Sequence, residues 1–372
     1  IYDVSQGHIS KEVQSSKSII HQTLALIEEA SKKGGKINGV PTGFRDLDKL
    51  TLGWQPSDMI IIAARPSMGK TAFVLSMARN IAVDEQKPVA FFSLEMSATQ
   101  LMMRLLVAEA QLDSRDVRSG RLTPEQWAHL EKSAKPLAEA PIFIDDTPAL
   151  PITEFRSKVR KLKSQHDIQL VIIDYLQLMT GPQDTKGNRE QEVAYISRTL
   201  KAIAKELNIP IIALSQLNRS VESQGGSKRP QLSNLRESGA IEQDADIVAF
   251  IHRPEYYGLT QLEDGTTTKN LAEVIVAKHR NGAVDTIRLK FLNDFAQFCD
   301  FDPLAGGGFA AGGEKEFGSA IDGGGFEMAG GFGDAGGFAA AGADFGMPPT
   351  STGADGSKAR GAAMSTSEEA PF

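Results

Sequence analysis

An apolar segment that leads into a short glycine-containing loop, and then into a second apolar segment, constrains this chain most. Residues 59–63 (MIIIA) predict a buried strand, residues 64–71 (ARPSMGKT) follow at once, and an apolar helix is expected after them. This order matches a phosphate-binding loop, except that Ala64 stands where the pattern has its first glycine. The alternative is a chance match in a glycine-containing turn, and the strand-to-helix context argues against it.

The chemistry of phosphate binding explains the residue types in this loop. Backbone N–H groups of the loop and of the helix N-terminus surround phosphates, and Gly69 lets the backbone approach them closely. Lys70 supplies a positive charge to the β- and γ-phosphates, and the Thr71 hydroxyl is a ligand for Mg²⁺. The sequence therefore predicts a site for ATP and Mg²⁺. The residues expected to bind the nucleotide are Ala64, Arg65, Pro66, Ser67, Met68, Gly69, Lys70, Thr71 and, from elsewhere in the chain, Asp174.

Apolar runs of strand length recur along the chain and alternate with helical stretches, such as the one that covers residues 193–207. These runs are residues 59–63, 89–92, 170–173, 210–214, 247–251 and 274–277. Continuous apolar strands between helices predict a parallel sheet that is covered on both faces. The last two runs, near residues 273–278 and 285–291, are joined by a segment that contains Asn281-Gly282. This dipeptide predicts a hairpin and therefore antiparallel strands at the C-terminal end.

Three polar side chains follow predicted strands and are candidates for the chemistry at the phosphates. Asp174 follows residues 170–173 and is expected to hold Mg²⁺, the alternative being an aspartate that caps a turn. Glu95 follows another apolar run and is a candidate general base for the attacking water, the alternative being a surface carboxylate. Gln216 has a neutral amide, which suits a sensor of the γ-phosphate better than a base.

Composition divides the chain into three parts: a linker region with an amphipathic helix (residues 1–36), an α/β domain (37–304) and a glycine-rich tail (305–372). The tail has three basic and nine acidic residues, a net of −6, which leaves 37 basic and 38 acidic residues in the rest, a net of −1. We expect the tail to be disordered, because it cannot bury enough apolar surface to offset its chain entropy. The N-terminal helix has an apolar stripe that packs either on its own domain or on a neighbouring subunit.

The sequence also bounds the compartment. One cysteine, Cys299, excludes an internal disulfide framework and a cysteine-based zinc site. No apolar run reaches the roughly 18 residues that a membrane helix needs, and no signal peptide is visible. We expect a reduced, cytoplasmic compartment and no membrane association. Because the chain begins with Ile1, we expect it to be a fragment or a processed piece.

Six motifs occur in an order that resembles a known family. They are ARPSMGKT, FFSLEMS, VIIDYLQLM, ALSQLNR, LRESGAIEQDADIV and AKHRNG. Together they resemble the C-terminal motor domain of the bacterial replicative DNA helicases of the DnaB type, over about residues 8–300. The resemblance implies a RecA-like P-loop NTPase fold, with a mostly parallel sheet flanked by helices. It also implies a homo-hexameric ring that hydrolyses ATP at its subunit interfaces, moves along single-stranded DNA and unwinds duplex DNA at the replication fork.

The resemblance assigns roles and partners beyond the loop. Lys70, Glu95 and Gln216 take the roles given above, and Lys278 and Arg280 are expected to reach into the neighbouring subunit's nucleotide. Their i, i+2 spacing on a strand suits this, because both side chains then point the same way. The alternative is a solvated pair on an edge strand. A helicase loader and a primase are implied partners, and the primase contact is expected to require the helical N-terminal domain that precedes the linker in full-length relatives.

The DNA-binding residues are expected in two loops, residues 180–189 and 218–237, which combine glycine with basic residues. Lys186, Lys228 and Arg229 are candidates from these loops, although plain surface loops are the alternative. The resemblance implies that Arg236, Glu237 and Gly239 contact the DNA backbone. Neither loop contains an aromatic residue, so we expect contacts to phosphates rather than base stacking, with DNA binding that weakens as salt rises.

Two other functions compete with the helicase. A RecA-like recombinase, which forms strand-exchange filaments, would share the fold and the phosphate loop. A non-catalytic, ATP-gated loader would bind nucleotide without turnover. The linker helix and the segment LRESGAIEQDAD favour the helicase over the recombinase, and the set of charged candidates at the phosphates argues against a non-catalytic protein.

Overall fold

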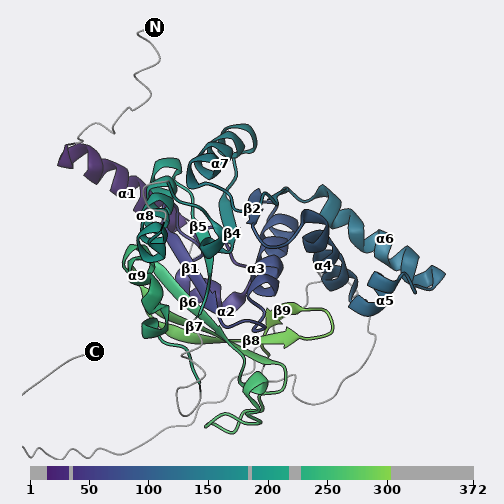
Figure 1. Ribbon diagram of the computed structural model, residues 1–372. Helices are drawn as coiled ribbons and strands as arrows, with labels where there is room; N and C mark the ends of the chain where they lie inside the picture. The colour runs from purple at the N-terminus through teal and green to yellow at the C-terminus, as the bar shows by residue number, and fades with distance from the viewer. Residues whose placement is uncertain (1–14, 33–36, 183–186, 218–227, 303–372) are drawn as a thin grey trace, which may run out of the picture. The chain divides into compact units, whose positions relative to one another are not determined.

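The computed structural model describes residues 15–32, 37–182, 187–217 and 228–302 (Figure 1). The chain divides into two units, Ile1–Gly308 and Phe309–Phe372. The predicted tail, Lys186 and residues 218–227 of the predicted loop 218–237 lie outside the described residues. Among the residues that the structure describes, no helix combines the length and the apolarity needed to cross a membrane.

A single mixed sheet forms the centre of the first unit, with the strand order β3-β2-β4-β5-β1-β6-β7-β8-β9. The first six strands in this order are parallel, and β7, β8 and β9 are antiparallel to their neighbours. The strands are β1 (Met59–Ala64), β2 (Val89–Ser93), β3 (Ile142–Asp145), β4 (Leu170–Asp174), β5 (Ile211–Gln216), β6 (Ile247–His252), β7 (Leu271–His279), β8 (Asp285–Leu292) and β9 (Gln297–Asp300). The predicted parallel sheet with an antiparallel C-terminal end is confirmed.

Helices cover both faces of this sheet (Figure 1). The helices of the described residues are α1 (Ser16–Lys32), α2 (Arg45–Thr51), α3 (Lys70–Arg79), α4 (Ala98–Ala110), α5 (Ser114–Ser119), α6 (Pro124–Glu139), α7 (Ile152–His166), α8 (Arg189–Leu207) and α9 (Gly239–Asp244), with shorter helical turns at Asn80–Asp84, Leu176–Leu178, Leu232–Ser238 and Pro254–Tyr257. Of these, α1 does not pack on the sheet. Alternate residues of β1 point to opposite faces, as a strand requires. Ile60 and Ile62 pack with Phe73 of α3 in one core, whereas Met59 and Ile61 belong to the core that contains α7 and α8.

Local sequence signals explain where several helices begin. The Asn188 side chain accepts a hydrogen bond from the Gln191 N–H and so caps the start of α8. Ser97 and Gln100 form a capping box at the start of α4. The apolar stripe of α1 differs from these buried helix faces, because Ile19, Ile20, Leu24 and Ile27 are 47% to 59% exposed. Packing of this stripe on its own domain, one of the two expectations, is therefore not what the structure shows.

Candidate nucleotide-binding site

The phosphate-binding loop connects β1 to α3, as the sequence predicts. Gly69 precedes the first residue of α3 and has a φ of +92°, a conformation that residues with a side chain rarely adopt. A Cβ at this position would lie 3.1 Å from the Phe298 ring of β9, which is closer than van der Waals contact. The backbone conformation therefore favours glycine here, and a side chain would also have to displace the Phe298 ring by a few tenths of an ångström.

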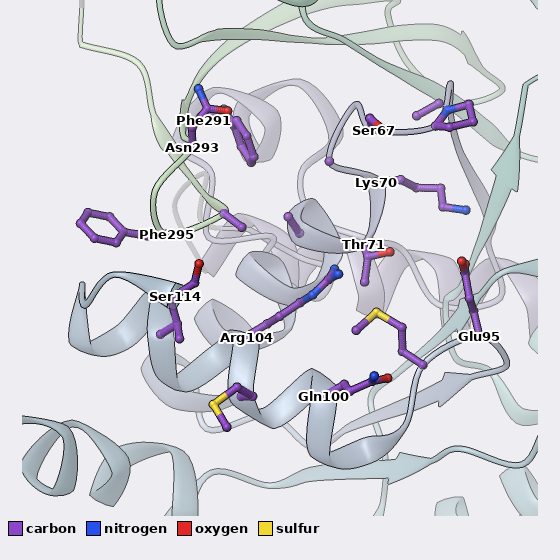
Figure 2. A pocket seen from close by; sticks show the side chains of 18 of the residues that line it. Ser67, Lys70, Thr71, Glu95, Gln100, Arg104, Ser114, Phe291, Asn293 and Phe295 are labelled. Carbon is purple, nitrogen blue, oxygen red and sulfur yellow. The ribbon is translucent and has the colours of Figure 1, made fainter. Parts of the chain in front are cut away.

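A cavity of about 710 Å³ opens above this loop (Figure 2). Its walls come from the loop and the start of α3, from the end of β2, from α4 and α5, from the end of β5 and from the β8–β9 turn. The sequence-predicted residues in its lining are Ala64, Arg65, Pro66, Ser67, Gly69, Lys70, Thr71, Glu95 and Gln216. Met68 is the exception in the loop, since its side chain is buried in the core instead. The cavity volume suits a nucleotide, within the ordinary range for small-molecule sites.

Asp174, at the end of β4, contacts both polar side chains at the start of α3. Its Oδ2 accepts a hydrogen bond of 2.6 Å from the Thr71 hydroxyl, and its Oδ1 lies 3.5 Å from Lys70 Nζ. Burial lowers the pKa of the Lys70 ammonium, and the charges of Asp174 and Glu95 oppose this shift. Lys70 also lies over the Tyr175 ring, with Nζ 4.3 Å from its centre. The site therefore holds a compact, largely buried ion pair.

The Asp174 carboxylate and the Thr71 hydroxyl fit a magnesium ion. Asp174 Oδ1 is buried and accepts no hydrogen bond, so a lone pair is left for a cation. A carboxylate and a hydroxyl are oxygen ligands of the kind that Mg²⁺ takes beside substrate phosphates and waters. No cluster of three or more acidic, histidine or cysteine side chains that could hold a metal exists among the described residues. The fit therefore depends on phosphate oxygens to complete the coordination.

Glu95 and Gln216 stand at strand ends on the same edge of the sheet. The Glu95 side chain is exposed within the cavity and points toward Lys70 in Figure 2. Gln216 is the last residue of β5, and its side chain is also exposed. Next to it, Gln177 donates a hydrogen bond of 2.8 Å to the Ser215 hydroxyl and so connects the segment after β4 to the end of β5. The expected base and the expected sensor thus share one cavity.

Lys278 and Arg280 lie at the opposite edge of the sheet. His279 pairs with Ile247 at the start of β6, which pairs in turn with Ile60, near the start of β1. The phosphate loop begins at Ala64, at the other end of β1 and four residues from Ile60, which is roughly 13 Å away at about 3.3 Å per residue. Lys278 and Arg280 therefore stand apart from the cavity of their own chain.

Comparisons with known proteins give this arrangement its family. Residues 39–300 match the family described as the DnaB-like helicase C terminal domain. The chain belongs to this family. It is 49% identical over 302 residues to the replicative DNA helicase DnaB of Geobacillus stearothermophilus and 47% identical over 302 residues to the replicative DNA helicase DnaC of Bacillus subtilis (strain 168). These matches cover 81% of this chain and 65% of each relative, so the chain spans about two thirds of their length.

Solved structures of an ATPase domain and of a helicase share this fold. The ATPase domain is 38% identical with a TM-score of 0.72, and the match covers 78% of this chain and 100% of that one. A structure of a DnaB-like replicative helicase and its interactions with primase is 36% identical with a TM-score of 0.69. That match covers 81% of this chain and 70% of the other. The expected RecA-like architecture is therefore confirmed.

The residues predicted to bind DNA are only partly described in this DnaB-like domain. Lys186 lies outside the described residues, and Arg236 and Glu237 are described in their backbone alone, within the helical turn Leu232–Ser238. Gly239 begins α9, and a Cβ there would meet nothing within 4 Å. These contacts stay predictions.

Two of the DNA candidates have partners within the chain. Arg229 forms an ion pair of 3.2 Å with the buried Glu273 and donates a hydrogen bond of 2.8 Å to Thr286. Lys228 Nζ lies 5.2 Å from the centre of the Tyr257 ring. A contact between Arg229 and DNA would therefore compete with an existing ion pair to a buried carboxylate.

The structure adds cavity residues that sequence reasoning missed. Arg104 extends from α4 toward Thr71 (Figure 2), and its guanidinium has no ion pair or hydrogen bond with any residue in the described ranges. Phe291 and Asn293 line the opposite wall from the β8–β9 turn. The capping box at Ser97 and Gln100 is visible in the sequence and predicts a helix, and residues three and four apart share one face of it. Which partner that face meets depends on the tertiary fold.

Proposed function

We propose that this chain is the ATP-driven motor of a cytoplasmic replicative DNA helicase. The observation that carries the proposal is that Lys70, Thr71 and Glu95 line one nucleotide-sized cavity in a DnaB-like domain. The buried Asp174 contacts the first two of these residues. Its relatives are named replicative DNA helicases. Since the chain spans only part of their length, the activity of the whole protein is inferred from the domain that they share.

Each charged group has a defined task in ATP hydrolysis. Backbone N–H groups around Gly69 and the Lys70 ammonium bind the β- and γ-phosphates. Thr71 and Asp174 hold the magnesium ion, which when bound neutralises charge on those phosphates. Glu95 accepts a proton from the attacking water, and Gln216 donates a hydrogen bond to the γ-phosphate and so responds to its presence.

Lys278 and Arg280 act on the nucleotide of a neighbouring subunit. Their place at the edge of the sheet opposite the phosphate loop supports this role, because they stand away from the cavity of their own chain. An arginine supplied in trans stabilises charge on the transferring phosphoryl group and can raise the rate by about 10³–10⁵. This arrangement makes hydrolysis depend on contact between subunits, as in the homo-hexameric ring that we propose.

Single-stranded DNA is the proposed track through the centre of this ring. Six copies of the predicted DNA-binding residues would line the path. These residues are Arg236, Glu237, Gly239, Lys186, Lys228 and Arg229. The net charge of −1 for residues 1–304 does not oppose this, because DNA binding depends on the local distribution of charge. A helicase loader and a primase are further proposed partners, the second supported by the solved DnaB-like relative described with its primase interactions.

Strand displacement from a forked duplex, measured with and without ATP, tests the proposal. We expect unwinding only with ATP. Glu95→Gln should lower the rate of ATP hydrolysis by about 10²–10⁴, while nucleotide binding persists. ATP binding by the wild-type chain without hydrolysis would favour a non-catalytic loader. Electron microscopy with ATP and single-stranded DNA adds a second readout. Closed six-membered rings support the helicase, whereas open filaments would favour a recombinase.

A further inference from the structure

The Lys278 and Arg280 side chains both bond to carbonyl groups near the end of α9. Lys278 Nζ donates a hydrogen bond of 2.5 Å to the Glu242 carbonyl, and Arg280 Nη2 donates one of 2.5 Å to the Gln243 carbonyl. Cations are favoured at this end of a helix because its last carbonyls lack partners within the helix. Both side chains therefore have hydrogen-bond partners within their own chain.

Asp246, two residues after α9, has a carboxylate that faces two sides. On the inner side, its Oδ2 accepts a hydrogen bond of 2.8 Å from the Met59 N–H and forms an ion pair with Lys201. On the outer side, its Oδ1 lies 3.5 Å from Arg280 Nη1. The Asp246 carbonyl also accepts a hydrogen bond of 2.9 Å from the Arg280 N–H. Asp246 therefore contacts both the backbone and the side chain of Arg280.

Asp246 and Arg280 differ in exposure, which indicates which of the two side chains is free to move. Asp246 has a side chain that is 7% exposed, whereas the Arg280 side chain is 44% exposed. The carboxylate is thus anchored in the sheet, and the guanidinium is the movable partner. The guanidinium donates one hydrogen bond to the Gln243 carbonyl and faces Asp246 with Nη1, so part of its rigid fork of five N–H donors is left for another partner. Its 44% exposure makes the side chain accessible to a phosphate that another subunit could present.

We propose that Asp246 is a positioning residue that aims the Arg280 guanidinium at the neighbouring nucleotide. The inference rests on the proposed trans role of Arg280, and it adds a residue that touches neither nucleotide nor DNA. Geometry at the reacting phosphate matters because small displacements of a catalytic group cost rate steeply. Removing the Asp246 charge should therefore lower the turnover rate and leave the affinity for ATP in the chain's own cavity unchanged.

Lys201 offers a matched control on the inner side of the same carboxylate. Its Nζ contacts Asp246 Oδ2 and donates a hydrogen bond of 2.8 Å to the Ser57 carbonyl, and it makes no contact with Arg280 in the structure. Lys201→Met removes the ammonium that pairs with Asp246 Oδ2, but it leaves the contact between Asp246 Oδ1 and Arg280 in place. A purely structural role of Asp246 would make both variants equally harmful to turnover.

The test is a double-mutant cycle in the full 372-residue chain, read as ATP hydrolysis with single-stranded DNA. We expect Asp246→Asn to lower kcat by about tenfold with KM for ATP unchanged, and Lys201→Met to keep at least about half of the wild-type rate. In the Arg280→Ala background, Asp246→Asn should have no further effect on kcat, since the group that it positions is gone. Thermal unfolding of every variant distinguishes a loss of folding from a misplaced Arg280 side chain. If Asp246→Asn does not fold, Asp246→Glu enters the same cycle.

Two outcomes would overturn the inference. One is a double variant whose fold-loss in kcat equals the product of the fold-losses of Asp246→Asn and Arg280→Ala. This would mean that the two residues act independently. The other is a folded Asp246→Asn protein that hydrolyses ATP at the full wild-type rate, while the Arg280→Ala single variant is slow. By contrast, normal turnover by Arg280→Ala alone would remove the proposed trans role itself, so the two failures can be told apart.

Discussion

Replacement of Asp174 by asparagine should destabilise the protein, when measured without nucleotide, through the charge that it leaves behind. The Asp174 side chain is 1% exposed and the Lys70 side chain 13% exposed, with 3.5 Å between Oδ1 and Nζ. Asparagine keeps the size of the side chain and an oxygen that can accept the hydrogen bond from the Thr71 hydroxyl. The change therefore isolates one effect, which is the loss of the only negative charge that directly contacts the buried Lys70 ammonium among the described residues.

The expected size follows from the burial of this pair. At an effective dielectric constant near 20, two unit charges 3.5 Å apart attract by about 5 kcal/mol. Removing one partner of a buried pair typically costs about 3–5 kcal/mol, because the other charge stays desolvated. We therefore expect a loss of about 3 kcal/mol in the free energy of unfolding. For a domain of this size, that loss lowers the melting temperature by roughly 6 °C.

Chemical denaturation of four proteins measures this coupling: the wild type, Asp174→Asn, Lys70→Met and the double variant. Since each single variant leaves one uncompensated buried group, the double variant should lose less than the sum of the two by about 2–3 kcal/mol. Removing Asp174 should also lower the Lys70 pKa further, so the deficit of Asp174→Asn should shrink as the ammonium deprotonates at alkaline pH. Additive losses, or a deficit that does not change with pH, would refute the buried ion pair.

Three further changes have defined outcomes. Gly69→Ala should cost about 1–3 kcal/mol in the free energy of unfolding in urea, because it combines a φ of +92° with a Cβ 3.1 Å from the Phe298 ring. Burial lowers the pKa of His252 to about 4, so the native state resists protonation while the unfolded state gains a proton near pH 6.5. The wild type should therefore lose about 3 kcal/mol more stability than His252→Phe between about pH 7.5 and pH 4, as followed by denaturation at each pH. Arg104→Ala should weaken binding of a fluorescent ATP analogue by about tenfold or more if its guanidinium contacts the phosphates, and unchanged binding would exclude that contact.

The part of the fold that could be predicted from the sequence is the part set by local signals. The strand, loop and helix around residues 59–79 are contiguous, and their apolar runs and glycine specify each piece without help from the rest of the chain. The edge strands β3 and β9 were missed for a physical reason. Each has four residues, and the residues of β3 are only half-buried, so neither forms a long apolar run. Their pairing is decided by β2 and β8, which are distant in sequence or joined by a turn.

The candidate site divides in the same way. Asp174 and Glu95 could be found because Asp174 ends β4 and Glu95 lies two residues after β2, and the carboxyl ends of parallel strands meet at one edge of the sheet. The Phe298 ring beside Gly69 could not, since its position depends on a contact between β9 and α3, where the Phe298 N–H donates a hydrogen bond of 3.0 Å to Ser76. Arg104 was missed because a helical pattern gives a shared face but not the cavity that the face meets.

The antiparallel end of the sheet serves both edges of the fold, and strand direction explains how. Because β7 runs opposite to β6, it ends beside the start of β6 and so delivers Lys278 and Arg280 to the edge away from the phosphate loop. β8 then runs back, and the β8–β9 turn reaches the loop edge, where Phe291 and Phe298 lie against Gly69. A further parallel strand after β6 would have ended at the loop edge and left the other edge without these cations. The reversal therefore lets one chain complete the wall of its own cavity and also places two cations at the opposite edge, where the ring that we propose would need them.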